Sequence, residues 1–368
     1  MAQTQMTPAQ ANALATAALL QRGIRIVRPL PAVSLNTGQY AVIKLDRFGV
    51  FTGLRMQVQV TFSNSGTSSA SLPTVSPFAP WNVFKNVVYH DFDGNDRINS
   101  APFFIYAVES FKSRSLGPRI ASSLNNFSSL FQVPTSVPAS GTATLQYEQA
   151  IPISYSNADF TGAVLAQVAS GQHQLELTVG DIVGSDPWTN AYVGSLPSGV
   201  TISNIQVTVY QEVVQPQSYK ELPLLSMGMC YGINGNLTDS TNLVQGQTKH
   251  INYANARKIL SLGVAYDNGD TFNDGSDITE FELLSNSSLY ILKCNPGYLQ
   301  QRMREHLAGD MPDGFYYFGS RSQPIDTSIY GNFQVGVKPN SVNSGAYLAY
   351  YFESIYPLGA PLPGIAVG

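Results

Sequence analysis

Apolar and polar side chains alternate in the stretch "LRMQVQVTF" at residues 54–62. One face would hold Leu54, Met56, Val58, Val60 and Phe62, and the other Arg55, Gln57, Gln59 and Thr61. A period of two predicts a half-buried strand of an antiparallel sheet. The same alternation recurs in "HQLELTV" (173–179), "NIQVTVYQEV" (204–213) and "AYLAYYF" (346–352).

The segments between these strands are rich in proline and glycine, as in "LPTVSPFAPW" (72–81) and "VPTSVPASG" (133–141). Many short alternating strands separated by such turns indicate an all-β protein built from sandwiches or jelly rolls.

A weak internal repeat indicates two such units. "VFKNVVYHDFDGNDRI" (83–98) and "KILSLGVAYDNGDTFNDGSDI" (258–278) are each a strand that runs into an acidic, glycine-bearing turn. A helix is predicted after each one, at 101–117 and at 295–309. We therefore expect two copies of one β-unit, with a boundary near 215–223.

A further helix is predicted at the start of the chain, in "TPAQANALATAALLQRG" (7–23). Thr7 suits the N-cap, Pro8 the first helical position and Gln10 the far side of a capping box, while Gly23 suits the C-terminal stop. The helix is rich in alanine, which lets it approach its neighbours closely.

Composition restricts the function. Only 12% of the 368 residues are charged, and the net charge of -4 excludes the electrostatic footprint of a nucleic-acid-binding protein. A surface short of Lys and Glu is inexpensive to desolvate and favours burial against other proteins. A neutral β-protein without such partners is the alternative. Two cysteines, Cys230 and Cys294, support neither a disulfide framework nor a structural zinc site. No signal peptide and no apolar run of membrane-spanning length is expected.

The acidic stretch "YDNGDTFNDGSDITEFE" (266–282) contains a quarter of the chain's 24 acidic residues. An EF-hand register with Gly275 at position 6 places Asp270 at position 1, but Phe272 at position 3 and Phe281 at position 12, where ligand oxygens are required. We therefore interpret the stretch as a turn between strands. A calcium site of another kind, held by Asp270 or Asp274, stays open.

Enzymatic motifs are missing from the sequence. Nothing fixes two carboxylates on facing strands as glycoside hydrolysis requires, and no nucleophile or phosphate-loop motif occurs. His90, Asp91 and Asp93 in "YHDFD" could face a metal, but a turn is the better interpretation. We predict no catalytic residues, no cofactor and no essential metal.

Four segments resemble the tectivirus-type major capsid protein, the double jelly-roll coat subunit of icosahedral bacteriophages with an internal membrane. They are "QMTPAQANAL" (5–14), "YSNADFTGAVLAQV" (155–168), "YANARKILSLGVAYDNGDTFNDGSDI" (253–278) and "PDGFYYFGSRSQPIDTSIYGNFQVGVKPNSVN" (312–343). The matches lie in order and reach from near the start of the chain to about residue 350.

The resemblance implies two tandem jelly rolls, at 24–215 and 216–356, after the helix at 1–23. It also implies a homotrimer of nearly hexagonal outline that contacts neighbouring capsomers, minor capsid proteins and vertex proteins. Such a protein is part of the virion capsid, is made in the host cytoplasm and binds no specific nucleic acid. The alternatives are a carbohydrate-binding or hydrolytic jelly-roll protein, or a minor coat or spike protein.

The sequence also predicts contacts for the two ends of the chain. The first acidic residue is Asp46, whereas Arg22, Arg25 and Arg28 follow the first helix. We expect these arginines to face the membrane or the inner shell, since cations are favoured beside an anionic lipid surface. The segment 357–368 is uncharged and contains three prolines, which forbid a helix, so we expect an extended arm on a neighbouring subunit.

Overall fold

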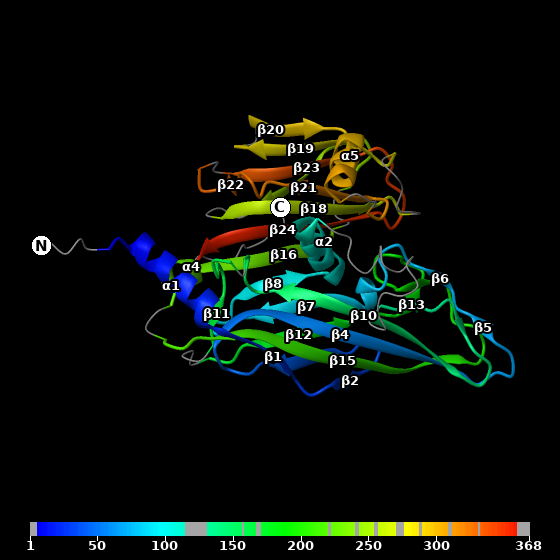
Figure 1. Ribbon diagram of the computed structural model, residues 1–368. Helices are drawn as coiled ribbons and strands as arrows, with labels where there is room; N and C mark the ends of the chain where they lie inside the picture. Colours follow the sequence, from blue (N-terminus) through cyan, green and yellow to red (C-terminus); the bar gives the residue numbers. More distant parts are fainter. Residues whose placement is uncertain are drawn as a thin grey trace, which may run out of the picture. The chain divides into compact units, whose positions relative to one another are not determined.

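The computed structural model describes residues 6–114, 131–156, 158–166, 171–219, 222–239, 243–253, 257–269, 276–286, 289–307, 311–329 and 332–358. The chain divides into two compact units, of which the first comprises Met1–Tyr106 and Pro118–Gly232. The second comprises Ala107–Gly117 and Ile233–Gly368. Strands dominate both units, as the ribbon in Figure 1 shows, and the prediction of an all-β fold with a few short helices is confirmed.

The first unit is built on two main sheets. One has the strand order β1-β15-β4-β10, with β2 on β15 and β11 on β4, and the other contains β8-β7-β12-β3. The strands are β1 (Ile24–Pro29), β2 (Val33–Leu35), β3 (Tyr40–Lys44), β4 (Val50–Asn64), β7 (Phe84–His90), β8 (Asp96–Ser100), β10 (Thr142–Pro152), β11 (Val164–Leu165), β12 (Gln174–Val179) and β15 (Val200–Gln215). Short pairs complete the unit: β5 (Ala70–Ser71), β6 (Thr74–Val75), β9 (Ser136–Val137), β13 (Val183–Gly184) and β14 (Tyr192–Val193).

The period-two predictions hold in this unit. Along β4 the apolar side chains from Met56 to Phe62 are buried, while the polar ones between them are partly exposed. Antiparallel pairing sets Val58 opposite Val207 of β15, so the apolar faces of both strands coincide. Phe51 of β4 then packs against Tyr89 of β7, with ring centroids 5.7 Å apart, which places the core between the two sheets.

The second unit is again a pair of sheets, ordered β21-β18-β24-β16 and β17-β23-β19-β20, with β22 on β18. Residues from both sheets form one buried cluster, which includes Leu262, Leu283 and Tyr350. The strands are β16 (Met229–Asp239), β17 (Lys249–Tyr253), β18 (Lys258–Asp267), β19 (Ile278–Ser285), β20 (Leu289–Cys294), β21 (Phe315–Gly319), β22 (Ile325–Asp326), β23 (Phe333–Pro339) and β24 (Tyr347–Pro357).

One expectation about this unit is wrong. The pattern "AYLAYYF" predicts a strand with one open face, but β24 is buried on both faces from Leu348 to Ser354. One side packs into the core cluster, and the other is covered because Tyr351 lies over Gly263 of β18 and Glu353 is held by Arg321.

The helices are α1 (Pro8–Arg22), α2 (Pro102–Ser113), α4 (Leu224–Met227) and α5 (Pro296–Leu307), with a 3₁₀ turn η1 (Trp81–Val83). The capping box that the sequence predicts at Thr7 and Gln10 is present. Gly23 does end α1, but in an extended and not a left-handed conformation. Glycine is required there for another reason: a Cβ would overlap the Leu19 carbonyl and the side chain of Val214. Within the described ranges, no helix has the length and apolarity needed to cross a bilayer.

The predicted boundary near 215–223 follows the end of β15, whereas the chain leaves the first unit at Gly232, within β16. Of the expected arm at 357–368, only the first two residues are among those described, and Pro357 ends β24. Residues 359–368 lie outside the described residues.

Candidate assembly surfaces

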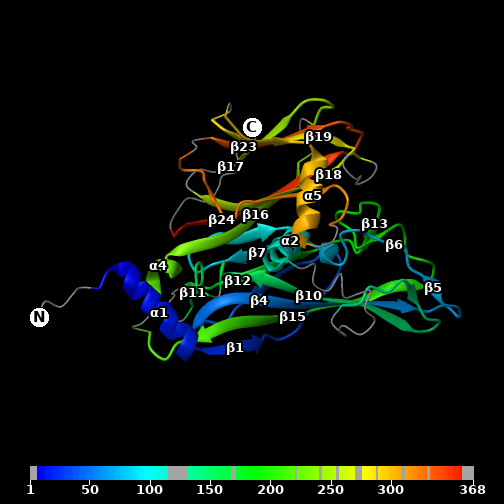
Figure 2. The same ribbon diagram turned by 45° about the horizontal axis from the view of Figure 1, so that its top comes forward.

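The N-terminal helix meets the first unit through few contacts. Leu19 is the buried residue of α1 and packs in a small cluster with Val214, Leu222 and Met227. Farther along the helix, the amide of Asn12 donates to Ser226 Oγ at 3.0 Å, and its carbonyl oxygen accepts from the backbone N–H of Leu225 at 3.0 Å. Asn12 thus satisfies the start of α4, which lies beside α1 in Figures 1 and 2.

An exposed apolar surface surrounds this helix pair. We call it the N-terminal surface, and its large apolar residues, each at least two-fifths exposed, are Met6, Leu14, Leu20, Ile24, Val27, Leu224 and Leu225. Monomeric proteins rarely expose a group of such side chains on adjacent elements. The part of this surface that α4 contributes could not be predicted from the sequence, because two leucines in a four-residue helix give no periodic signal.

The three arginines predicted to face the inner shell lie at this surface but differ in their surroundings. Arg22 ends α1, while Arg25 and Arg28 are on β1, three positions apart, so their side chains point to opposite faces of the strand. Arg28 Nε lies 3.1 Å from Asp46 Oδ2, and its guanidinium lies 5.5 Å from the centre of the Phe48 ring. Among the described residues, Arg22 and Arg25 form no ion pair.

Each unit also presents an apolar strand at the end of a sheet. In the second unit, β20 is the last strand of its sheet, and Leu289, Tyr290 and Ile291 follow one another with 38–60% of their surface exposed. In the first unit, β3 ends its sheet and exposes Tyr40 and Val42. An edge strand with exposed apolar side chains is a ready surface for association with another chain.

Lys293 is the charged residue on the β20 edge. Its ammonium nitrogen lies 2.9 Å from Glu280 and 3.0 Å from Glu282, and 5.1 Å from the centre of the Tyr290 ring. These carboxylates raise the pKa of Lys293, and they more than offset its charge, so no unpaired cation stands next to the apolar residues of this edge.

The acidic stretch behaves as the predicted turn where it is described. β18 ends at Asp267 and β19 begins at Ile278. Asp267 accepts from the backbone N–H of Gly269 at 2.6 Å, and Asp277 accepts from Ser341 Oγ at 2.8 Å. The weak calcium candidates, Asp270 and Asp274, lie outside the described residues.

The "YHDFD" residues do not converge on one point. His90 contacts Asp96 and Glu176 through its two ring nitrogens, at 2.6 and 3.1 Å. Asp91 instead binds the buried Arg97 at 2.7 Å and accepts from two backbone N–H groups of its own turn. Among the described residues, no group of three His, Cys, Asp or Glu side chains is placed to hold a metal ion.

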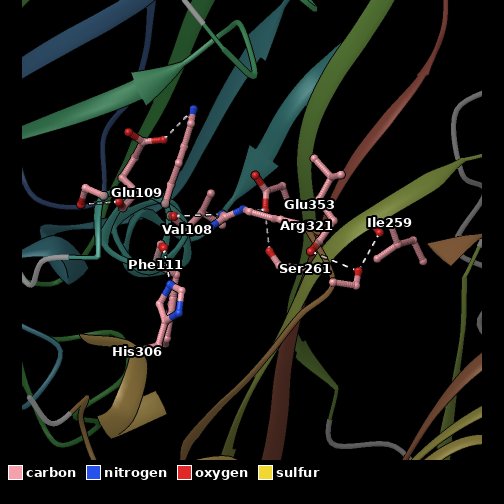
Figure 3. Close-up of polar contacts among 12 residues, drawn as sticks. Val108, Glu109, Phe111, Ile259, Ser261, His306, Arg321 and Glu353 are labelled. Atoms are coloured by element: carbon pink, nitrogen blue, oxygen red, sulfur yellow. Dashed lines mark hydrogen bonds and ion pairs between the residues drawn. The ribbon is translucent and has the colours of Figure 1, made fainter. Parts of the chain in front are cut away.

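The second unit contains a buried polar network that the sequence analysis missed (Figure 3). Glu353, on β24, has no exposed surface, and its Oε2 lies 2.8 Å from Arg321 Nη2 and accepts from Ser261 Oγ at 2.6 Å. The same Arg321 nitrogen donates to the carbonyl of Val108 at 3.1 Å. A complete set of partners of this kind is what allows a carboxylate to be buried.

The network extends along the part of α2 that belongs to the second unit. His306 Nε2 lies 2.8 Å from the carbonyl oxygen of Phe111, and the Phe111 ring stacks on Tyr317 with centroids 3.5 Å apart. Burial raises the pKa of the nearby Glu109 carboxyl, an effect that Lys112 opposes. The Glu353 carboxylate has a structural role, because it is fully buried and no substrate can reach it.

Comparison with known proteins covers almost the whole chain. Residues 1–216 match the family "P3 major capsid protein N-terminal", and residues 234–358 match "P3 major capsid protein C-terminal". The chain is 27% identical to the major capsid protein P3 of Enterobacteria phage PRD1, over 96% of both chains.

Solved structures show the same fold. The chain is similar to a protein of Sulfolobus turreted icosahedral virus, with 15% identity, 91% of each chain covered and a TM-score of 0.67. It is also similar to the PBCV-1 virus capsid, with 9% identity, 94% of this chain and 97% of that chain covered, and a TM-score of 0.55. The predicted tandem jelly rolls and the resemblance to tectivirus-type coat proteins are therefore confirmed. The chain belongs to the P3 major capsid protein family and is a structural protein of a virus shell, not an enzyme.

Proposed function

We propose that three copies of this major capsid protein form a homotrimeric, pseudo-hexagonal capsomer of an icosahedral phage shell that surrounds an internal membrane. The observation that carries the proposal is the exposed apolar edge in each unit, at β3 and at β20. Two different edges on one chain suit a head-to-tail contact, and contacts of that kind close into a ring. Permanent interfaces of this class bury roughly 2,000 Å² or more.

Light scattering on the purified chain tests the trimer. We expect a trimer mass at micromolar concentration, and its loss in a Leu289→Ser, Ile291→Ser variant. A matched control is Leu224→Ser, Leu225→Ser, which removes two leucines of the N-terminal surface that are, at 67% and 56%, more exposed than Leu289 and Ile291 at 60% and 38%. A stable folded monomer of the parent chain contradicts the proposal, as does equal dissociation of both variants.

The N-terminal surface is proposed to face the membrane or the inner side of the shell. Its exposed apolar side chains lie next to Arg22 and the two arginines of β1, and apolar and basic groups together are the two ingredients of binding at a lipid interface. Because Arg25 and Arg28 point to opposite faces of β1, at most one of these two points directly toward the lipid. Each basic residue near an anionic surface contributes about 1 kcal/mol. Arg28 contributes less, because Asp46 already neutralises part of its charge.

Flotation with anionic vesicles tests this orientation. We expect the Arg22, Arg25, Arg28→Ser variant to bind far more weakly than the parent. A variant that lacks Lys44, Lys85 and Lys258 carries the same charge change elsewhere and should bind like the parent; Lys44 and Lys258 are exposed, and Lys85 is half-buried beside Asp181. Equal loss in both variants would mean that net charge, and not this surface, governs binding.

A capsomer within a shell must also contact other proteins of that shell. We propose that the capsomer contacts neighbouring capsomers, minor capsid proteins and vertex proteins, and that the segment 357–368 lies on a neighbouring subunit. Cys230 and Cys294 form no disulfide, which suits synthesis in the reducing host cytoplasm. Cross-linking of assembled particles that carry Pro361→Cys should give a covalent dimer of two chains, and not a cross-link within one chain.

A further inference from the structure

The second unit contains a hollow of about 520 Å³ between the C-terminal end of α2, the length of α5 and strand β21. Its apolar wall includes the stacked rings of Phe111 and Tyr317, together with Leu292, Leu299 and Met303. Figure 3 shows Phe111, His306 and Arg321 close together on one side of α2. Hollows of this size can hold a small ligand, and here polar groups supply slightly more than half of the lining, which favours a charged one.

The charges around the hollow are unbalanced. Four permanent cations line it, but Glu305 is the one carboxylate among the lining residues. The cations are Lys112, Arg114, Arg302 and Arg321. Two neighbouring carboxylates offset part of this charge, Glu353 beside Arg321 and Glu109 beside Lys112. Burial raises the pKa of Glu109, which weakens its share.

Two of the arginines, Arg114 and Arg302, make no ion pair at hydrogen-bonding distance with the described residues. Arg302 Nη1 lies 3.6 Å from Glu305 Oε2, too far for a hydrogen bond, and both side chains are more than half exposed. Arg114 makes no ion pair with the described residues. A guanidinium presents a planar fork of N–H donors that matches phosphate and carboxylate groups.

Arg114 also occupies a position that its backbone does not favour. It follows the last residue of α2 with a φ of 54°, in the left-handed region where glycine commonly ends a helix. Strained residues of this kind often persist where a side chain has a function. Arg114 combines such a conformation with a place in the lining of the hollow.

We propose that this hollow binds a small anion that carries at least two negative charges on phosphate or carboxylate groups. Arg114 and Arg302 clamp the charged groups, and the Phe111–Tyr317 stack supplies the apolar wall. The competing explanation is that the cations only neutralise the negative C-terminal ends of α2 and α5.

Calorimetric titration of the purified full-length protein tests the site, with inorganic pyrophosphate and citrate as separate probes at matched ionic strength. We expect saturable binding of at least one probe, weakened by added salt because the contacts are ionic. The variant Arg302→Ser should reduce the affinity about tenfold or more, as expected for loss of one charge-assisted fork. The control Lys44→Ser, Lys258→Ser removes two exposed charges elsewhere and should bind like the parent.

Arg114→Gly separates binding from structure. Glycine relieves the left-handed conformation, so this variant should melt at a higher temperature than the parent while it binds the anion more weakly. Failure of both probes to bind the parent protein overturns the proposal. So does unchanged binding in Arg114→Gly and Arg302→Ser, because the cations would then serve only the helix ends.

Discussion

Strand β4 of the first unit and strand β18 of the second bury their residues in opposite ways. Along β4, from Arg55 onwards, buried apolar residues alternate with polar residues that keep contact with solvent. Along β18, every residue from Ile259 to Asp267 is buried. One sheet has an open face and the other is covered on both.

The difference lies in what covers the second face. On this second face, the residues of β18 are small or polar: Ser261, Gly263 and Ala265. They pair with Glu353, Tyr351 and Ala349 of β24. Ring packing over Gly263 and the Arg321 network fill this face. A strand such as β18 can therefore be wholly buried without being wholly apolar, provided that its polar groups have hydrogen-bond partners.

Removal of the buried charge partner should break the second unit most severely. Glu353→Gln leaves Arg321 with a charge that is four-fifths buried, which typically costs about 3–5 kcal/mol. Scanning calorimetry should show the loss. Because Trp81 and Trp188 both lie in the first unit, tryptophan fluorescence can follow that unit separately. The double variant Glu353→Gln, Arg321→Gln should recover part of the stability, and a single variant as stable as the parent contradicts the account.

Filling the glycine on β18 should be nearly as damaging. A Cβ on Gly263 overlaps Cε1 of Tyr351, a ring with no exposed surface and no room to move. We expect Gly263→Val to cost about 3 kcal/mol, at the upper end for an overpacked core. The matched change on the open face of β4, Gln59→Val, should stay within about 0.5 kcal/mol. Equal effects in urea unfolding would remove the distinction between the two strands.

Acid should act first on the first unit. His173 is fully buried there, and burial lowers its pKa from 6.5 to about 4. Its contribution is therefore complete above pH 6.5 and is lost as the pH falls towards 4, up to about 3 kcal/mol. Tryptophan-detected unfolding from pH 7 to 4 should show this loss, and His173→Gln should flatten the profile. An unchanged profile would mean that other groups control the acid response.

The smallest effect on stability is expected at Glu109. Its pH dependence is opposite in sign to that of His173. Burial raises the pKa of this carboxyl, so the folded state favours its neutral form. Its contribution is complete below the pKa of the unfolded chain and is lost as the pH rises through the folded value. Glu109→Gln should therefore raise the melting temperature by a few degrees at pH 7 and leave it unchanged at pH 4. A lower melting temperature at pH 7 would show that the pairing with Lys112 outweighs burial.

The first unit was the more predictable from sequence, for a physical reason. Where one face of a strand meets solvent, the composition alternates, as in β4, β12 and β15, and a period of two reveals it. In β24 both faces are covered, so alternation in the sequence does not report burial. The capping residue Thr7 was also predictable, because a cap is a local contact.

The candidate surfaces were harder to predict. The arginines after the first helix stand out in the sequence, but the ion pair of Arg28 with Asp46 depends on strand placement. The contribution of α4 depends on a contact between Asn12 and Ser226, 214 positions apart. Likewise, the cationic hollow is lined by four separate segments of the chain, at 111–114, 292, 298–306 and 317–322, so no local motif in the sequence predicts it.

The pairing of β1 with β15 has a consequence for the order of events during synthesis. Ile24 pairs with Gln215, so β1 waits for a partner that leaves the ribosome roughly 190 residues later. At 5–20 residues per second that delay is about 10–40 s. During this interval the edge of β1, with its exposed Ile24 and Val27, is open to association with other nascent chains. Dense translation on one message would thus favour premature contacts between copies, and a chaperone that shields the first 30 residues would raise the yield of assembly-competent protein.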